Sequence, residues 1–284
     1  MSLADCARAA HDFEPRRYLR FEAAGHTLGW IRPPAADRLS RFPDVFSHDS
    51  TCVRLSAALD TLASRDAAIA QVLGELAAQG TLTGWRDELY AVAPAFGDPP
   101  LFHIERAAAR LLGVTTYAVH VNGVVDATHM WVARRSATKP IDPGMLDNLV
   151  GGGLAAGFSV AQTLVKEGRE EAGIPADMMA RAVACGRIRL LREVPEGVQS
   201  EIIFVHDLVL PAGFQPVNQD GEVAELRLLP NAEVLHLLRA NADITLDASL
   251  VMMSYLLRQG LVSAAEATPD RWFLPEAQDP LTRT

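Results

Sequence analysis

The chain has 284 residues, of which 49% are hydrophobic and 21% are charged, so it can bury a sizeable core and does not have the composition of a disordered protein. Its net charge of −9 at pH 7 argues against binding to nucleic acid or to an anionic membrane. An anionic ligand therefore needs a local group of cationic side chains or a metal ion.

Cysteine usage and the N-terminal sequence bear on the compartment. The three cysteines, Cys6, Cys52 and Cys185, are widely separated and form no CxxC pair. This pattern argues against a disulfide framework or a zinc site and favours a reducing environment. The start, MSLADCARAAHDFEPRRYLRF, lacks the apolar segment of a signal peptide, and no run of about 18 apolar residues follows. We therefore expect a cytoplasmic protein.

The first part of the chain predicts a small unit of strands and helices. Residues 18–31 alternate apolar and polar side chains around two glycines, which is typical of a short hairpin. Residues 64–80 carry apolar side chains at helical spacing and end at a glycine, which indicates a helix. A strand is predicted at 85–92 and a further helix at 105–112. We therefore predict an N-terminal α+β domain over residues 1–112.

From residue 113 the pattern changes to longer strand-like runs. The runs TTYAVHVNGVVD and THMWVARRS predict two strands, with a turn at Asn122-Gly123, a dipeptide suited to positive φ. A loop over 137–153 then leads to a helix that begins at Ser159. The remaining predicted elements are strands at 186–193, 201–210 and 223–229, helices at 231–239 and 247–259, and a polar tail over 269–284.

This order of elements indicates the fold class. Strands stand on both sides of a central helix, and further helices follow them. Such an arrangement favours a mixed β-sheet sandwiched between helices, an α/β (α+β) fold. We place this second domain at residues 113–268, after the smaller N-terminal unit.

The chemistry is concentrated in the stretch GGGLAAGFSVAQTLVKEGREEAG, residues 151–173. Ser159 and Gln162 have the spacing of a capping box, which starts a helix. Gly173, followed by Ile174 and a proline, is a matching helix end. A glycine-rich loop therefore enters a helix with both ends defined.

Three glutamates, Glu167, Glu170 and Glu171, stand at i, i+3 and i+4 on that helix and share one face. At about 5.5 Å and an effective dielectric constant of about 20, neighbouring carboxylates repel by roughly 3 kcal/mol per pair. Two interpretations follow. The face is either exposed to water, where the repulsion is small, or it is a site for a dication such as Mg²⁺, which prefers several oxygen ligands.

With its loop, cap and flanking strands, this stretch resembles the Nudix box, the loop–helix signature of hydrolases that cleave diphosphate-linked compounds. The family pattern is G-x5-E-x7-R-E-U-x-E-E-x-G-U, where U is bulky and apolar. Three positions depart from it: Phe158 replaces the first glutamate, Lys166 the arginine, and Gly168 an apolar residue. The matching residues are Gly152, Glu167, Glu170, Glu171, Gly173 and Ile174.

Other segments resemble one Nudix branch, the thiamine-diphosphate-related hydrolases with an extra N-terminal domain. In that branch an apolar residue and a lysine likewise stand where Phe158 and Lys166 stand here. The similar segments are LGWIRPP, YAVHVNGVV, MWVARRSATKPIDPGMLDNLVGGG, VKEGREEAGI and NQDGEV.

The resemblance implies hydrolysis of a diphosphate bond in a small molecule. The first candidate substrates are thiamine diphosphate and its oxidised analogues. It implies Mg²⁺ (or Mn²⁺) held by Glu167, Glu170 and Glu171, with Glu170 as a catalytic residue. Glu222, in the loop QDGEV, is the candidate for a further metal ligand or the general base, or else a surface turn residue. The candidate substrate-binding residues are the cationic cluster Arg134, Arg135 and Lys139, together with Asp147, Gly152 and Gly153.

Three alternatives stay open to different degrees. An isomerase of isopentenyl diphosphate needs a cysteine in the segment DPGMLDNLVGGG, which has none. A ligand-binding module without activity predicts lost glutamates, but all three are present. A hydrolase of nucleoside-diphosphate compounds such as ADP-ribose or NADH is not distinguished by the sequence. The N-terminal domain can serve specificity or a homodimer contact.

Overall fold

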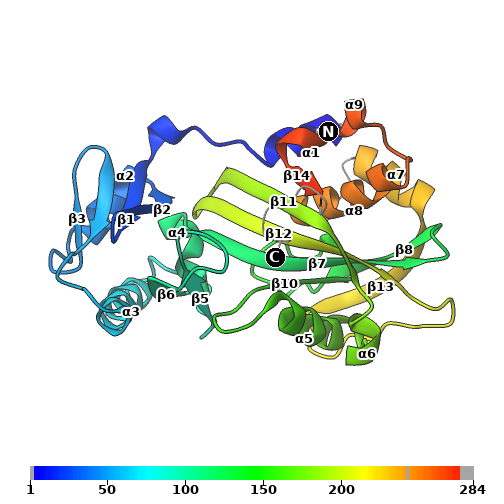
Figure 1. Ribbon diagram of the computed structural model, residues 1–284, viewed down its shortest axis with the longest axis horizontal. Coiled ribbons are helices and arrows are strands. Elements are labelled where there is room, and N and C mark those ends of the chain that lie inside the picture. The colour runs from blue at the N-terminus through cyan, green and yellow to red at the C-terminus, as the bar shows by residue number, and fades with distance from the viewer. Residues whose placement is uncertain (1–2, 241–242, 276–284) are drawn as a thin grey trace.

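The structure is a computed structural model that describes residues 3–240 and 243–275, and two units lie side by side in it (Figure 1). In the N-terminal unit, strands pair in the order β2-β1-β4-β3, and a separate hairpin joins β5 to β6. The predicted hairpin over 18–31 is confirmed as β1 and β2. The strands of this unit are β1 Leu19–Ala23, β2 His26–Ile31, β3 Phe46–His48, β4 Cys52–Leu55, β5 Leu89–Val92 and β6 Phe102–Glu105.

Helices and aromatic rings close the core of this unit. The ring of Phe21 packs against those of Phe46 and Phe102, at centroid distances of 6.2 and 5.9 Å. The predicted helix at 64–80 is confirmed as α3, which begins earlier because Thr61 and Ser64 form a capping box. The helical segments are α2 Pro33–Leu39, α3 Leu62–Ala78 and α4 Ala109–Leu112, with short 3-10 helices at Pro15–Arg17 and Arg106–Ala108.

The C-terminal unit is built on one large mixed sheet in the order β13-β8-β7-β12-β11-β14. β7 runs parallel to β12 and antiparallel to β8. Two short strands lie off this path: β10 pairs with β7, and β9 pairs with β8. The strands are β7 Thr115–Val125, β8 His129–Arg135, β9 Leu146–Asp147, β10 Val150–Gly153, β11 Val183–Val194, β12 Gly197–Val209, β13 Val223–Pro230 and β14 Phe273–Pro275.

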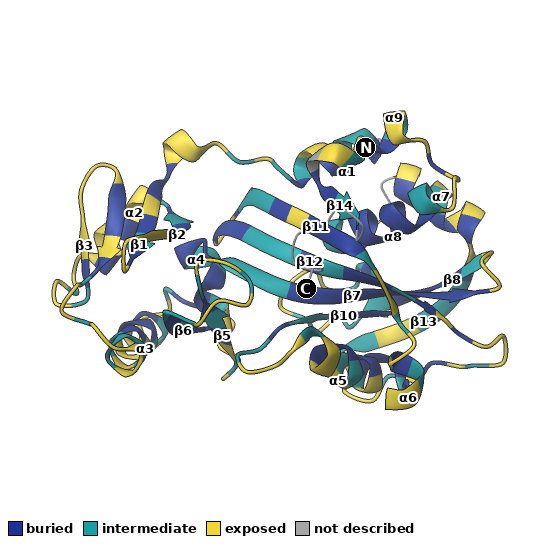
Figure 2. Ribbon diagram, in the orientation of Figure 1, coloured by how far each residue is buried: buried dark blue, intermediate teal, exposed yellow. Residues whose placement is uncertain are grey.

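Helices cover both faces of this sheet, as Figure 1 shows. α5 and α6 pack on one face, and α1, α7, α8 and α9 on the other, each over its own apolar cluster. The predicted α+β fold with a sheet between helices is therefore confirmed. Figure 2 shows that β7 is dark along most of its length, because both of its faces are covered, whereas β11 and β12 alternate between dark and teal segments. The helices are α1 Leu3–Ala9, α5 Val160–Ala172, α6 Ala176–Met179, α7 Asn231–Ala240, α8 Leu246–Arg258 and α9 Ala264–Ala267, with a 3-10 helix at Pro269–Arg271.

The turn predicted at Asn122-Gly123 is wrong. Both residues lie inside β7, and the chain reverses at Asp126-Ala127, where φ is 50° and 53°. Asn122 is fully buried, and its side-chain amide donates to Asp207 Oδ1 at 2.9 Å. Gly123 is needed for space rather than for a turn, since a Cβ there would lie 2.1 Å from Leu149 Cδ2. A buried polar network overrides the local turn preference of this dipeptide.

Two terminal segments differ from prediction. The first helix, α1, packs on the core of the C-terminal unit, where Leu3 and Ala7 are buried beside α8. The predicted polar tail begins with ordered structure, because β14 pairs with β11 and Trp272 is 1% exposed. The rest of that tail, 276–284, lies outside the described residues. The domain boundary near residue 112 stays a proposal.

Close main-chain contacts join the two units. Arg32, just after β2, donates hydrogen bonds to the carbonyls of Val194 and Pro195 at 2.6 and 2.9 Å. A Cβ at Gly197, the first residue of β12, would lie 2.0 Å from the carbonyl oxygen of Arg110, so this strand and α4 touch backbone to backbone. The N-terminal unit is thus held against the β11–β12 end of the large sheet.

Within 3–240 and 243–275, no helix combines the length and the apolar character needed to cross a membrane.

Candidate active site

Helix α5 has the ends that its sequence predicts. Ser159 Oγ accepts from Gln162 N, and the Gln162 side chain accepts from Ser159 N at 2.9 Å, which completes the capping box. Gly173 ends the helix with φ of 63°, a left-handed conformation that glycine adopts without strain. Both ends of the helix are therefore defined by local interactions.

The three glutamates of α5 occupy different environments. Glu171 is 7% exposed, and its Oε2 accepts from Gly151 N at 2.8 Å. Burial raises the pKa of Glu171 well above its usual value, and the nearby Asp147 and Glu167 raise it further, against the hydrogen bond from Gly151. Glu167 lies against Gly152, where an added Cβ would sit 2.4 Å from the Glu167 carboxyl carbon. Burial also raises the pKa of Glu167, against the effect of Lys166.

Glu170 shares a lysine partner with Glu167. Lys166 Nζ lies 2.8 Å from Glu170 Oε2 and 2.8 Å from Glu167 Oε1, so the lysine bridges the two carboxylates. Burial lowers the pKa of Lys166, but the two carboxylates outweigh this and raise it. Glu170 lines an open surface hollow with Phe158 and Lys166, whereas Glu167 lines a different cavity. Glu167 and Glu170 therefore meet at Lys166, although each borders a different hollow.

That cavity lies between the two units and has a volume of about 380 Å³. Glu167 and Gly152 line it from the box, and Arg135, Lys139 and Glu222 line it from β8, the following loop and the start of β13. An adjoining cavity of about 520 Å³ shares part of this lining and also reaches Asp147 and Gly153. Most of the predicted substrate-binding residues therefore meet here.

Ion pairs hold the cationic side chains of this cavity. Arg135 Nη1 donates to Asp147 Oδ2 at 2.7 Å, and Lys139 forms an ion pair with Glu222. Burial raises the pKa of Glu222, but Lys139, Arg86 and Arg106 outweigh this and lower it, so the carboxylate is ionised at neutral pH.

Arg134 is the exception among the predicted phosphate-binding residues. It donates to the Gly144 carbonyl at 2.7 Å and lies 3.5 Å from Glu225, and it does not line either of the two cavities. Because neighbouring side chains on a strand point to opposite faces, Arg134 and Arg135 cannot both face one cavity.

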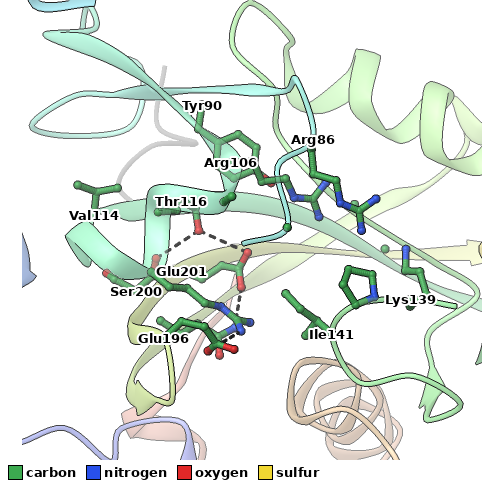
Figure 3. A pocket seen from close by; sticks show the side chains of 18 of the residues that line it. Arg86, Tyr90, Arg106, Val114, Thr116, Lys139, Ile141, Glu196, Ser200 and Glu201 are labelled. Carbon is green, nitrogen blue, oxygen red and sulfur yellow. Dashed lines mark hydrogen bonds and ion pairs between the residues drawn. The ribbon is translucent and has the colours of Figure 1, made fainter. Parts of the chain in front are cut away.

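The N-terminal unit supplies residues that sequence reasoning missed. Arg86, Tyr90 and Arg106 line the cavity from one side, and Lys139 and Ile141 lie across from them (Figure 3). No motif marked these three residues, because their approach to the box depends on how the two units dock.

The lining of the cavities also includes acidic residues that sequence reasoning missed. Gln199 Nε2 lies between two carboxylates, at 2.9 Å from Glu201 Oε2 and 3.3 Å from Asp247 Oδ1. Burial raises the pKa of Asp247 to about 7, and the charge of Glu201 adds to this effect. Gln199 and Glu201 are two residues apart on β12, so their side chains lie on the same face of the strand. This spacing is the sequence signal that could have grouped them.

A buried polar network supports the loop that enters the box. His120 Nδ1 lies 2.8 Å from Asn148 Oδ1, and Asn148 donates to Asn122 at 3.3 Å. Through Asn122 the network continues to Asp207, which pairs with Arg258 at 2.6 Å. The ring of His120 lies against Gly151, where a Cβ would come within 2.9 Å of it. The glycines of β10 therefore admit His120, Glu167 and Tyr90, one at each position.

The acidic residues provide suitable oxygen donors for a hard dication. Burial raises the pKa of Glu167 and Glu171, and their hydrogen bonds offset only part of this effect. Carboxylate oxygens of this kind are suitable ligands for Mg²⁺ and Mn²⁺. In the described part of the chain, no three acidic, histidine or cysteine side chains already enclose one metal position. Lys166 stands between Glu167 and Glu170 with 42% of its side chain exposed, so it can turn into water. The donor chemistry fits, and the assignment of these three ligands stays a prediction.

Comparison with known proteins places both units in families. Residues 115–248 match the NUDIX domain, and residues 2–116 match a domain of unknown function, DUF4743. Nudix hydrolase 24, chloroplastic, of Arabidopsis thaliana is 39% identical over 250 residues, which cover 86% of this chain and 68% of that protein. Nudix hydrolase 20, chloroplastic, of the same plant is 36% identical over 257 residues, covering 86% of this chain and 69% of that protein.

Among solved structures, DR0079 from Deinococcus radiodurans matches 59% of this chain and 99% of its own, with 23% identity and a TM-score of 0.46. The predicted cytoplasmic location is wrong on this comparison, because both plant relatives are named as chloroplastic. Identity of this level over more than two thirds of those relatives shows that the chain belongs to the Nudix hydrolases, enzymes that act on diphosphate bonds.

Proposed function

We propose that this Nudix hydrolase cleaves the diphosphate of thiamine diphosphate, or of its oxidised analogues, to the monophosphate. The observation that supports a diphosphate ligand is that Glu167 of the box lines the same cavity as Lys139 and Arg135. An acidic protein of net charge −9 gathers cationic groups there, which an anionic ligand needs. The thiamine half of the proposal is supported by the resemblance of the box and four other segments to that branch.

Each side chain has a role that follows from its place. Glu167, Glu170 and Glu171 are the proposed ligands of Mg²⁺ or Mn²⁺. Such a dication neutralises phosphate oxygens and lowers the pKa of a coordinated water. Lys166 pairs with both Glu167 and Glu170, so it must turn away for these carboxylates to bind a metal, and its exposure allows this.

The chain's own groups bind and orient the diphosphate. Arg135 is held by Asp147, so its guanidinium is fixed at the cavity wall. Lys139 faces the same space and pairs with Glu222, which is ionised and is the proposed proton acceptor. When phosphate oxygens engage Lys139, the Glu222 carboxylate is released to accept a proton from water.

A second candidate is a hydrolase of nucleoside-diphosphate compounds such as ADP-ribose or NADH. The adjoining cavity of about 520 Å³ gives space for a larger organic group next to the proposed diphosphate position.

A hydrolysis screen tests the proposal. Phosphate or monophosphate release is measured with Mg²⁺ for thiamine diphosphate, its oxidised forms, ADP-ribose, NADH and common nucleotides. We expect the thiamine compounds to have the highest kcat/KM, and Glu170→Gln to reduce it. Glu75→Gln, on the exposed face of α3, is the matched control. Preference for a nucleotide overturns the thiamine assignment, and equal inactivity of wild type and Glu170→Gln on every compound supports a binding module instead.

A further inference from the structure

One wall of the cavity belongs to the N-terminal unit, whose family has no assigned role. Arg86 precedes β5, Tyr90 lies in β5, and Arg106 begins the 3-10 helix after β6. All three line the cavity that Glu167 and Lys139 line from the C-terminal unit (Figure 3). A diphosphate bound beside Glu167 therefore lies next to side chains of both units.

This wall is fixed directly to the box loop. Ala156 N, in the loop between β10 and α5, donates to the Leu89 carbonyl of β5 at 2.7 Å. The hydroxyl of Tyr90 fills the space beside Gly153, where an added Cβ would lie 2.0 Å from it. The Arg106 guanidinium lies 5.8 Å from the centre of the Tyr90 ring and supports its other side. The loop between β10 and α5 thus holds β5 in position.

Arg86 has the loosest ion pair among the cations of the cavity. Lys139 is engaged by Glu222, Arg135 by Asp147 at 2.7 Å and Arg106 by Glu88 at 2.6 Å. Arg86 approaches Glu222 only to 4.0 Å. The Arg86 side chain is also 36% exposed, so its guanidinium can take a new anionic partner at little cost.

The main chain of Arg86 is nevertheless well anchored. Its N–H donates at 2.8 Å to Oε1 of Glu105, and Glu105 is 3% exposed. A fixed backbone with a loosely paired guanidinium at the mouth of a cavity is suited to bidentate binding of phosphate oxygens.

We propose that the N-terminal unit forms part of the substrate site, with Arg86 as its phosphate-binding residue. The inference rests on the proposed function only in that the ligand is a diphosphate. It does not depend on which organic group the diphosphate carries. Arg86 and Lys139 then hold the diphosphate from opposite units, with Glu222 between them.

Calorimetric binding of methylenediphosphonate tests this, since its P–C–P bridge is not hydrolysed. The full chain is titrated in the presence of Mg²⁺ as wild type, Arg86→Gln, Arg86→Lys and Arg38→Gln. Arg38 is an exposed arginine of α2 and lies outside the cavity lining, so it controls for the lost charge. Thermal unfolding checks that the variants remain folded.

We expect Arg86→Gln to raise the Kd about 10- to 100-fold, the size of a lost charge-assisted hydrogen bond, with Arg38→Gln unchanged. Arg86→Lys is expected to fall between them, because it keeps the charge but not the planar fork. Wild-type affinity in Arg86→Gln overturns the inference, as does a wild type that does not bind methylenediphosphonate.

The two proposals fail in different ways. If the Arg86→Gln effect is found but thiamine diphosphate is not hydrolysed, the inference holds and the substrate assignment fails. If thiamine diphosphate is hydrolysed with the same KM by wild type and Arg86→Gln, the function holds and the inference fails.

Discussion

The two walls of the cavity differ in how their residues are brought there. On the C-terminal wall, Gly152 and Glu167 belong to one loop–helix motif, and local spacing determines their approach. On the N-terminal wall, Arg86 and Tyr90 reach the same space only through docking of β5 on the box loop. The comparison teaches that the local motif positions the carboxylates of the cavity. The shape of the cavity depends in addition on a contact between the two units.

The largest expected effect is on the C-terminal wall. Removal of divalent metal with EDTA and the substitution Glu167→Gln should each lower phosphate release about 100-fold or more, because both remove the charge compensation that diphosphate cleavage needs. A discontinuous phosphate assay on the best substrate of the screen measures this, with Glu75→Gln as the control. Full activity in EDTA would show that the carboxylates of α5 do not act through a metal.

A smaller effect separates chemistry from stability on the same wall. Gly152→Ala places a Cβ 2.4 Å from Cγ and Cδ of Glu167, so the carboxylate must move. We expect kcat to fall about 10- to 100-fold, since a displacement of about 1 Å at a reacting centre has effects of this size. Unfolding in urea should change little, because a flexible side chain can turn away. Unchanged kcat would mean that the observed position of Glu167 is not the one used in catalysis.

The N-terminal wall is tested by the neighbouring glycine. Gly153→Ala places a Cβ 2.0 Å from Tyr90 Oη, a buried and poorly movable group. We expect a loss of about 2 kcal/mol in the free energy of unfolding. Tyr90→Phe removes that hydroxyl and should restore part of the loss in the double variant.

Gly74→Ala is the control for this pair, because nothing lies within 4 Å of its added Cβ on α3. It should stabilise the protein by up to about 1 kcal/mol through helix propensity. If Tyr90→Phe gives no rescue of Gly153→Ala, the contact between β5 and the box loop does not hold the two walls together.

The smallest expected effect lies at Asp247, in the lining of the adjoining cavity. Burial, Glu201 and Asp147 raise the pKa of Asp247 to about 7, against His120 and Arg110. The folded state therefore holds a proton that the unfolded state releases near pH 4, so this contribution to stability is lost as pH rises through about 7.

Asp247→Asn removes that dependence. From pH 5 to pH 8 the wild type should lose stability and the variant should not, so the variant gains about 1 kcal/mol in free energy of unfolding relative to wild type. This value is small because water in the open cavity weakens the effect of burial. Urea unfolding across this pH range measures it. A difference that does not vary with pH would show that Asp247 stays ionised throughout.

The sequence predicted the parts of this fold that depend on local patterns. The capping box at Ser159, the stop at Gly173 and the hairpin over 18–31 follow from residue spacing alone, and the structure has them. The turn at Asn122 failed because tertiary hydrogen bonds, with Asp207 above all, outweigh the preference of a dipeptide.

The site was predictable to the same extent. Lys139, Arg135 and Glu222 were found because they stand beside recognisable strand and loop patterns, and they meet in the cavity. The place of Lys166 between Glu167 and Glu170 is not revealed by spacing. Arg86 belongs to no sequence pattern, because it reaches the cavity only when β5 docks on the other unit.

The most direct test of the account is a crystal structure with Mn²⁺ and methylenediphosphonate, in which anomalous scattering locates the metal. We expect Mn²⁺ beside Glu167 and the diphosphonate between Lys139 and Arg86, inside the cavity that both units line. Metal away from Glu167, or diphosphonate bound outside this cavity without contact to Lys139 and Arg86, would contradict the account.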